Sequence, residues 1–439
     1  MIQSNHNNKF ILGFIVTAFA FIVSVNASLA KDDLGFDSII LVPKENTLKI
    51  KRMNRFAYKN HTLRFQKVNS KIYTLPLSAT DNKEEINKKI AELKKSGLFE
   101  IVEPDYKLGL DKVSERQYVK IIKHSEEDTL NVADTNTEEI TPNDRDFISQ
   151  YYLREINATK AWSVSKGKDS IIVGVLDTGT DANHPDLAGK IIGEPGINTT
   201  DDIGHGTEVS GMIAANTNNS EGIAGIGWNT KILPIKITDE FGQAKVSTVV
   251  QALDEASSRG VKIVQISLST NQFSQTLQDA IKEAQSRGIL VVSTGGNTGI
   301  EELRYPASFD GVIGVGAVNQ DKQKESYSTT GEHISLVAPG ASIFTTTTGS
   351  SYSAVTGTSF SAPQVAGAAA LVWSIAPGLS SDDVGTILFQ SAEDLGSPGK
   401  DHYFGYGLLN IQRAVEMAKE KTNQTIIPEV TPEKNWIRM

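Results

Sequence analysis

Short apolar runs rich in β-forming residues alternate with longer helical segments over most of this chain, and this alternation constrains the fold most strongly. Five runs are expected as strands: Ile171–Leu176, Lys231–Ile237, Val261–Leu268, Ile289–Ser293 and Val312–Val318. Helices are expected at Gln243–Arg259, Phe273–Arg287 and Ser361–Trp373. Alternation of this kind is typical of a mostly parallel sheet with helices on both faces. Residues 141–420 are therefore predicted to form a three-layer α/β domain.

A smaller α+β domain is predicted ahead of it, over residues 31–110. Three segments are expected as strands: Ile39–Val42, Lys71–Leu75 and Phe99–Asp105, the last ending at Pro104. Ile86, Ile90 and Leu93 follow helical spacing between them, with Asp81 expected to cap the helix and Gly97 to end it. The acidic segment 111–140 is predicted to be an exposed processing linker, and residues 421–439 a tail of unknown role.

The N-terminus carries the pattern of a secretory signal peptide. Lys9 precedes an apolar run, Phe10–Val25, and small residues follow at Ala27 and Ala30, either of which fits cleavage. The run also borders on the length of a membrane anchor, which is the alternative. Residues 1–30 are interpreted as a signal peptide of a secreted or cell-envelope protein.

Composition removes several classes of function. The chain has no cysteine, which excludes disulfides, thiolate metal sites and a cysteine nucleophile. A net charge of −9 argues against nucleic acid as the main partner. An exported chain without disulfides gains from other internal cross-links, among them bound metal ions.

Three short segments supply the groups of a nucleophilic triad. Asp177 ends Val173–Asp177, His205 lies between two glycines, and Ser359 follows Gly357-Thr358. A serine hydroxyl needs a base to accept its proton, and that base needs a carboxylate to orient it. Taken singly, an aspartate such as Asp177 is more often a turn residue, and His205 would be an ordinary loop or helix-start histidine. Taken together, they are interpreted as the orienting acid and the general base for the nucleophile Ser359.

The order Asp, His, Ser and the flanks of these residues resemble those of subtilisin-like serine proteases. Thr141-Pro142-Asn143-Asp144 also resembles the start of the mature enzymes of the thermitase-like branch, and residues 31–110 resemble the family's propeptide. The resemblance implies a secreted, monomeric endopeptidase that acts on proteins or peptides through an acyl-enzyme. It also implies a self-processing precursor whose propeptide is an intramolecular inhibitor.

The same resemblance assigns residues to the substrate cleft. Ser293–Asn297 matches the segment in which Asn297 stabilises the oxyanion, with a turn former as the alternative for that residue. The remaining substrate-binding residues are expected to be Ser267, Leu268, Ser269, Thr294, Gly296 and Arg304.

Arg304 is unusual for the floor of the first specificity pocket. It is expected either to extend into solvent or, helped by the hydroxyls of Ser269 and Thr294, to select Glu or Asp before the cut. The second possibility predicts processing after Glu139, which would leave Ile140 as the new N-terminus.

Calcium is the cofactor that the resemblance implies, bound by a loop with hard oxygen ligands. The expected ligands are Asp144, Asn216, Asn219, Glu221 and Ile223. No second carboxylate is evident after His184–Leu187, so a weakened or lost site is the alternative.

Two other classes of function are compatible with parts of this sequence. A non-catalytic binding protein could retain this fold, but it would not need Asp177, His205, Asn297 and Ser359 together. A free-standing inhibitor acting through residues 31–110 would not need the long downstream domain.

Overall fold

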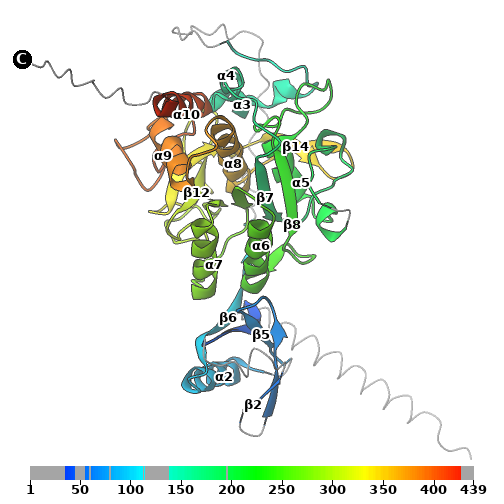
Figure 1. Cartoon of the computed structure of the whole chain (residues 1–439), viewed down its shortest axis with the longest axis vertical. Coiled ribbons are helices and arrows are strands. Elements are labelled where there is room, and N and C mark those ends of the chain that lie inside the picture. The colour runs from blue at the N-terminus through cyan, green and yellow to red at the C-terminus, as the bar shows by residue number, and fades with distance from the viewer. Residues whose placement is uncertain are drawn as a thin grey trace, which may run out of the picture. The chain divides into compact units, whose positions relative to one another are not determined.

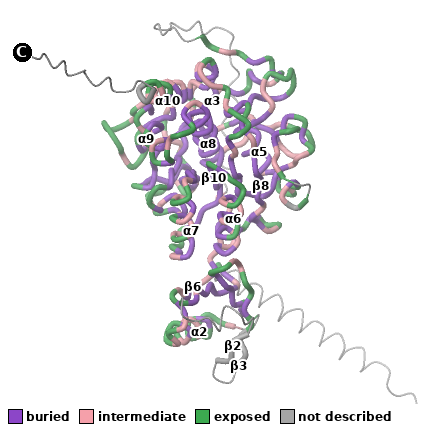
Figure 2. Tube along the Cα trace, in the orientation of Figure 1, coloured by how far each residue is buried: buried purple, intermediate pink, exposed green. Residues whose placement is uncertain are grey.

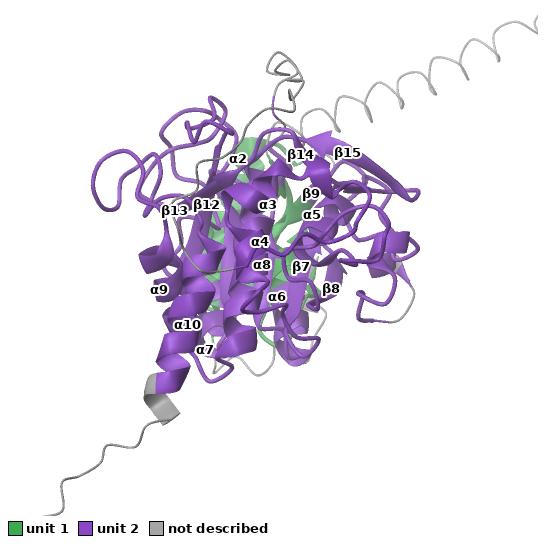
Figure 3. Ribbon diagram, turned by 90° about the horizontal axis from the view of Figure 1, so that it is seen from above, with its two compact units in different colours: residues 1–108, 244–251, 274–279 green, residues 109–243, 252–273, 280–439 purple. Residues whose placement is uncertain are grey.

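The computed structural model describes residues 35–44, 55–58, 61–78, 81–111, 113, 138–193 and 196–426. The predicted signal peptide, most of the acidic linker and the tail after residue 426 lie outside these described residues. Within them, no helix combines the length and the apolar character needed to cross a membrane. The chain divides into two compact units, one of residues 1–108, 244–251 and 274–279, the other of the remaining residues (Figure 3).

The second unit is built on a parallel sheet whose strand order is β13-β12-β11-β10-β7-β8. Its strands are β7 (Ile172–Asp177), β8 (Lys231–Lys236), β10 (Ile263–Ile266), β11 (Leu290–Thr294), β12 (Val312–Val318) and β13 (Ile334–Pro339). The sequence predicted the first five within two residues, and it missed β13. Nearly every residue of these strands is buried, because helices cover both faces of a parallel sheet.

Helices connect and cover these strands (Figure 1). They are α5 (His205–Ala214), α6 (Val246–Ser258), α7 (Gln275–Ser286), α8 (Thr358–Ile375), α9 (Ser381–Ser391) and α10 (Ile411–Ile426). The connections through α6 and α7 run along the sheet in one direction, and the connection through α5 runs in the other. Because crossovers between parallel strands are right-handed, α6 and α7 belong to one face and α5 to the other. This confirms the predicted three-layer α/β architecture.

Helix α8 packs against α5 and against strands β10–β13. All but one of its residues are buried, as its purple tube shows in Figure 2. The small side chains of its central run, Ala366–Ala370, allow the helix to approach the sheet closely. Shorter elements complete the unit: η3 (Phe147–Ser149), α3 (Tyr151–Glu155), α4 (Ala158–Ala161), η4 (Pro185–Leu187), η5 (Ile197–Thr199), β14 (Ile343–Thr347) and β15 (Ser351–Val355).

The first unit has a five-stranded sheet of order β4-β5-β1-β6-β9, a separate hairpin β2–β3 and one helix, α2 (Lys83–Lys95). Its strands are β1 (Phe36–Pro43), β2 (Arg55–Tyr58), β3 (His61–Arg64), β4 (Gln66–Lys67), β5 (Tyr73–Pro76), β6 (Phe99–Gly109) and β9 (Gln243–Lys245). Leu41, Ile86, Leu93 and Val102 are among the residues of its own apolar core.

Two sequence predictions in this unit were wrong in detail. Asn82, and not Asp81, caps α2, because Asn82 and Glu85 form a reciprocal capping box. The last strand does not stop at Pro104 but continues to Gly109. Pro104 is tolerated there because it lies beside a β-bulge, where the register with β1 shifts.

Two carboxylates of β6 cap the first turns of α6 and α7, and these turns lie in segments 244–251 and 274–279 of the first unit. Glu103 accepts hydrogen bonds from Ser274 Oγ at 2.7 Å, Thr276 N at 3.0 Å and Gln275 N at 3.1 Å, at the start of α7. Asp105 accepts from Ser247 N at 2.9 Å and Ser247 Oγ at 2.7 Å, at the start of α6. Both carboxylates satisfy N–H groups that the helices cannot satisfy themselves.

Candidate active site

Asp177 ends β7 at the point where the connections of the sheet change direction. From β7 the chain leads to β8 on one side, whereas from the neighbouring strand β10 it leads to β11 on the other. Ligands of open α/β sheets bind at the carboxyl ends of strands at such a point. The segments that follow β10 and β11, Ser267–Thr270 and Gly295–Asn297, reach the same edge.

His205, the first residue of α5, contacts Asp177 directly. Its Nδ1 lies 2.8 Å from Asp177 Oδ1, which also accepts a hydrogen bond from Thr178 N at 2.7 Å. A carboxylate only accepts hydrogen bonds, so Nδ1 donates and Nε2 is left as the basic nitrogen. Asp177 is fully buried, and its Oδ2 has no hydrogen-bond partner among the described residues.

The charge of Asp177 alters the basicity of this imidazole. Burial disfavours the protonated ring, but the attraction and hydrogen bond of Asp177 outweigh it and raise the pKa of His205. Glu208 and Asp201 add smaller contributions in the same direction. Gly206 allows the close approach, because a Cβ there would lie 2.0 Å from the carbonyl oxygen of Gly179.

Asp201 organises this corner of the site, and the sequence analysis missed it. Its Oδ2 accepts hydrogen bonds from Thr207 N at 2.9 Å and Thr207 Oγ1 at 2.7 Å. Its Oδ1 accepts from Thr178 Oγ1 at 2.8 Å and Gly204 N at 2.8 Å. One carboxylate thus ties the turn after Asp177 to the start of the helix that carries His205. The only signal in the sequence was an acidic residue four positions before the histidine.

Ser359 is the second residue of α8, where backbone N–H groups lack partners within the helix. It is 4 % exposed, and its hydroxyl donates to the carbonyl of Ser267 at 3.4 Å. The ring of Phe360, the next residue, lies 5.3 Å from that of His205, centroid to centroid. The structure therefore brings the three predicted triad segments together.

Asn297 lies beside the start of α8 with its amide fixed in orientation. Its Oδ1 accepts hydrogen bonds from Thr358 N at 3.0 Å and Thr358 Oγ1 at 2.7 Å. Its Nδ2 is consequently free to donate, and it contacts the carbonyl oxygen of Asp111 at 2.5 Å. An amide N–H held beside a helix start can stabilise a developing oxyanion.

The other predicted cleft residues lie in or near the segments that follow β10 and β11. Ser267 and Leu268 are fully buried after β10, and the hydroxyl of Ser267 donates to the carbonyl of Ser359 at 2.8 Å. The segment after β10 is linked to the segment that carries Arg304, because Thr270 and Tyr305 exchange backbone hydrogen bonds of 2.9 and 2.8 Å. Thr294 pairs with Thr358, Oγ1 to Oγ1, at 2.5 Å. The expectation that the Thr294 hydroxyl assists Arg304 was therefore wrong.

Arg304 is buried and does not extend into solvent. The residue is only 8 % exposed, which overturns the solvent-exposed alternative. Its Nε and one terminal nitrogen donate to Ser269 Oγ at 3.0 and 2.7 Å, as the sequence analysis expected of that hydroxyl. Gly296, with φ of +101°, makes room for it, because a Cβ there would lie 2.8 Å from Arg304 Cγ.

The predicted calcium loop is held by hydrogen bonds to Asp144. Its Oδ2 accepts from Asn218 N at 2.8 Å, and its Oδ1 accepts from Asn219 N at 3.2 Å. Asn216 turns its amide nitrogen toward the carbonyl of Ala188 at 2.9 Å, and Glu221 is exposed.

Asp186, in η4, is a second carboxylate that contacts this loop. It was not expected from the sequence. It accepts from Asn219 Nδ2 at 2.9 Å, from Ile223 N at 2.8 Å and from the hydroxyl of Tyr352 at 2.9 Å. N–H and O–H donors thus bridge the space between Asp144 and Asp186, where a calcium ion would need six to eight oxygens. As arranged, the residues present do not fit the ion. Among the described residues, no cluster of three or more His, Cys, Asp or Glu side chains is arranged to hold a metal.

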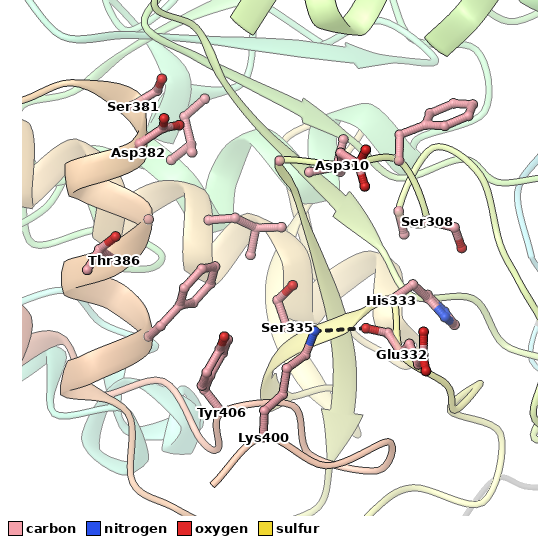
Figure 4. Close-up of a pocket in the computed structure, with 18 of the residues that line it drawn as sticks. Ser308, Asp310, Glu332, His333, Ser335, Ser381, Asp382, Thr386, Lys400 and Tyr406 are labelled. Atoms are coloured by element: carbon pink, nitrogen blue, oxygen red, sulfur yellow. Dashed lines mark hydrogen bonds between the residues drawn. The ribbon is translucent and has the colours of Figure 1, made fainter. Parts of the chain in front are cut away.

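A separate cavity of about 480 Å³ lies between β12 and α9. Figure 4 shows Lys400, whose Nζ donates to the carbonyl of Glu332 at 2.9 Å, with Ser335 and Tyr406 nearby. None of the predicted triad residues lines this cavity.

Comparison with known proteins agrees with this geometry. Residues 168–407 match the model of the subtilase family of peptidases. A thermophilic serine proteinase from Bacillus sp. (strain AK1) is 37% identical over 63% of this chain and 69% of its own length. Thermitase from Thermoactinomyces vulgaris is 35% identical over 63% of this chain and 99% of its own length. Subtilisin Savinase from Lederbergia lenta is 39% identical over 60% of this chain and 97% of its own length.

Proposed function

This chain belongs to the subtilase family of serine-type endopeptidases, and on that premise we propose that Ser359, His205 and Asp177 are its nucleophile, general acid–base and orienting carboxylate. The observation that carries the assignment is the 2.8 Å contact between His205 and Asp177, next to a serine at the start of α8. The substrates are proteins or peptides, whose peptide bonds are hydrolysed.

The proposed reaction uses each of these groups in turn. His205 Nε2 accepts the hydroxyl proton as Ser359 Oγ attacks the substrate carbonyl carbon, and Asp177 stabilises the imidazolium that forms. The oxyanion receives hydrogen bonds from Asn297 Nδ2 and from the backbone N–H of Ser359. Loss of one such donor typically lowers turnover ~10²–10³-fold. His205 then protonates the leaving amine, and water hydrolyses the acyl-enzyme.

The protein is further proposed to be exported as a precursor that processes itself. Residues 1–30 provide the signal peptide and residues 31–110 the inhibitory propeptide, followed by the linker 111–140. The peptidase domain, residues 141–420, acts as a monomer, and no role is assigned to the tail 421–439. Calcium has no part in this proposal, because donors within the loop already engage Asp144 and Asp186.

Replacement of the nucleophile tests this function. Ser359→Ala is expected to abolish peptide hydrolysis and labelling by an active-site phosphonate, and to leave a full-length precursor. Ser361→Ala is the matched control, because Ser361 is a buried serine of the same helix whose hydroxyl bonds to the carbonyl of Ala338 at 3.0 Å.

The control is expected to retain labelling and processing. Normal maturation of purified Ser359→Ala would overturn the nucleophile or the self-processing assignment. Absence of hydrolysis and labelling in the unsubstituted protein would favour a non-catalytic binding protein instead.

A further inference from the structure

Residues 109–111 lie along the predicted substrate cleft as an added strand. Gly109 and Ser269 exchange two backbone hydrogen bonds of 3.0 Å in an antiparallel bridge. Leu110 N donates to the carbonyl of Gly242 at 3.3 Å. Pairing of this kind is how a sheet edge receives an extended peptide. The segment therefore occupies the cleft as a substrate or product chain would.

The main chain of Asp111 occupies the catalytic position. Its carbonyl oxygen receives the 2.5 Å hydrogen bond from Asn297 Nδ2, the donor proposed to stabilise the oxyanion. Val113 lies beyond it, because a Cβ built on Gly357 would be 3.7 Å from Val113 Cγ2. Asp111 and Val113 thus both lie beside the start of α8. The peptide bond that follows Asp111 is therefore the one whose carbonyl meets the proposed oxyanion donor.

The side chain of Asp111 contacts both Arg304 and Ser269. One oxygen, Oδ1, pairs with a terminal nitrogen of Arg304 at 2.5 Å, and Oδ2 accepts a hydrogen bond from Ser269 Oγ. Glu302 contacts the opposite terminal nitrogen of Arg304 at 3.3 Å. Ser269 and Arg304 therefore provide two hydrogen-bond donors at fixed positions. A carboxylate satisfies both donors, whereas an apolar side chain would leave them without an acceptor.

Charge favours the same class of ligand. A guanidinium only 8 % exposed is costly to leave unpaired, so an incoming carboxylate restores a partner to a buried cation. Without that carboxylate, Arg304 keeps its contact with Glu302, which at 3.3 Å is longer than the 2.5 Å contact with Asp111. Burial raises the pKa of Asp111, because the cost of removing the carboxylate from water outweighs the attraction of Arg304 and the hydrogen bonds of Ser269 and Arg304.

We propose that this peptidase cleaves after acidic residues, with Arg304 and Ser269 as the specificity-determining pair, and that its first self-processing cut follows Asp111. The proposal rests on the proposed function of Ser359. Ser359 Oγ bonds to the carbonyl carbon of Asp111 and transfers its proton to His205. The C–N bond to residue 112 then breaks, and the new amine takes the proton. Water hydrolyses the ester and leaves Asp111 with a free carboxylate in the cleft.

This assignment changes the processing site expected from the sequence. Glu139 is exposed and pairs with Arg154 at 3.4 Å, while Ile140 N donates to the carbonyl of Thr159 at 3.0 Å. Asp111, and not Glu139, contacts Asn297. A cut after Glu139 would therefore be a later trimming step by another molecule, and it uses the same acidic specificity.

A peptide panel tests the specificity. Peptides that copy residues 107–113 carry Asp, Glu, Asn, Gln, Leu or Lys in place of residue 111. The mature enzyme is expected to show a kcat/KM for Asp and Glu roughly 10²-fold above that for Asn and Gln, since removal of one partner from a buried charge pair has effects of this size. Arg304→Met is expected to abolish the difference, and Arg259→Met, on the surface, is expected to retain it. Melting curves establish that both variants are folded.

The precursor tests the first cut. Timed sampling with N-terminal sequencing is expected to find an early product that begins at residue 112. Asp111→Asn should slow its appearance strongly, and Asp111→Glu should restore it. A first product that begins elsewhere overturns the assignment of Asp111. If the Leu peptide has the highest kcat/KM while Ser359 is still labelled by the phosphonate, the acidic specificity alone is overturned. Loss of both labelling and hydrolysis overturns the proposed function.

Discussion

Among individual residues, His205 has the environment with the clearest functional consequence. Its raised pKa arises from Asp177, with Glu208 and Asp201 contributing in the same direction against burial. A general base must be neutral to accept a proton, so kcat/KM should rise with pH through a midpoint above the usual histidine value of about 6.5. The same shift stabilises the folded state below the unfolded pKa, and this stability is lost as pH rises through the folded pKa.

Glu208 provides the test of this prediction. Glu208→Gln removes one of the carboxylates that favour the imidazolium, so the midpoint of the kcat/KM profile should move to lower pH. Glu416→Gln, on α10, removes a carboxylate far along the chain and should leave the midpoint unchanged. A Glu208→Gln profile that coincides with the unsubstituted one would show that Glu208 does not act on His205.

Among the secondary-structure elements, α6 and α7 depend on carboxylates supplied by β6 in the first unit. Glu103→Ala would leave the donors of Ser274, Gln275 and Thr276 without their acceptor. Loss of a helix cap costs about 1 kcal/mol in the free energy of unfolding. The measurement is denaturant unfolding of the precursor in the Ser359→Ala background, which prevents self-cleavage.

The matched control for this cap is Glu100→Ala, an exposed glutamate of the same strand. It should lower the free energy of unfolding by much less than Glu103→Ala. Equal losses in the two variants would mean that the contacts of Glu103 with α7 contribute nothing measurable.

For the molecule as a whole, the absence of cysteine leaves hydrogen-bonded loops as internal cross-links. Hydrogen bonds from Asn218, Asn219 and Ile223 join Asp144 and Asp186 to the same loop. Because these donors occupy the space a calcium ion would need, the melting temperature should be the same in excess chelator and in excess calcium. A melting temperature that rises with free calcium would contradict this and restore the metal to the loop.

The sequence alone determined the parallel sheet and the three segments of the proposed triad. Strands of a sheet covered on both faces are continuous apolar runs, so β7, β8, β10, β11 and β12 were recognisable one at a time. Each of the three proposed triad residues, Asp177, His205 and Ser359, was recognisable because it lies in a short motif with glycines and small residues beside it. The strand β13 was missed because Ile334–Pro339 lies among turn-forming segments, and its place is fixed only by pairing with β12.

Only the tertiary structure decided which distant groups meet. Asp201 accepts hydrogen bonds from Thr178, Gly204 and Thr207, and no sequence motif predicts these contacts. Arg304 could have been exposed or buried, and its burial follows from the space that Gly296 leaves and from the hydroxyl of Ser269. Asp111 reads as one more charge in an acidic linker, and only its contacts with Asn297 and Arg304 identify it as the residue before the cut. Motifs constrain chemistry locally, whereas partners that are far apart in sequence are selected by the packing that brings them together.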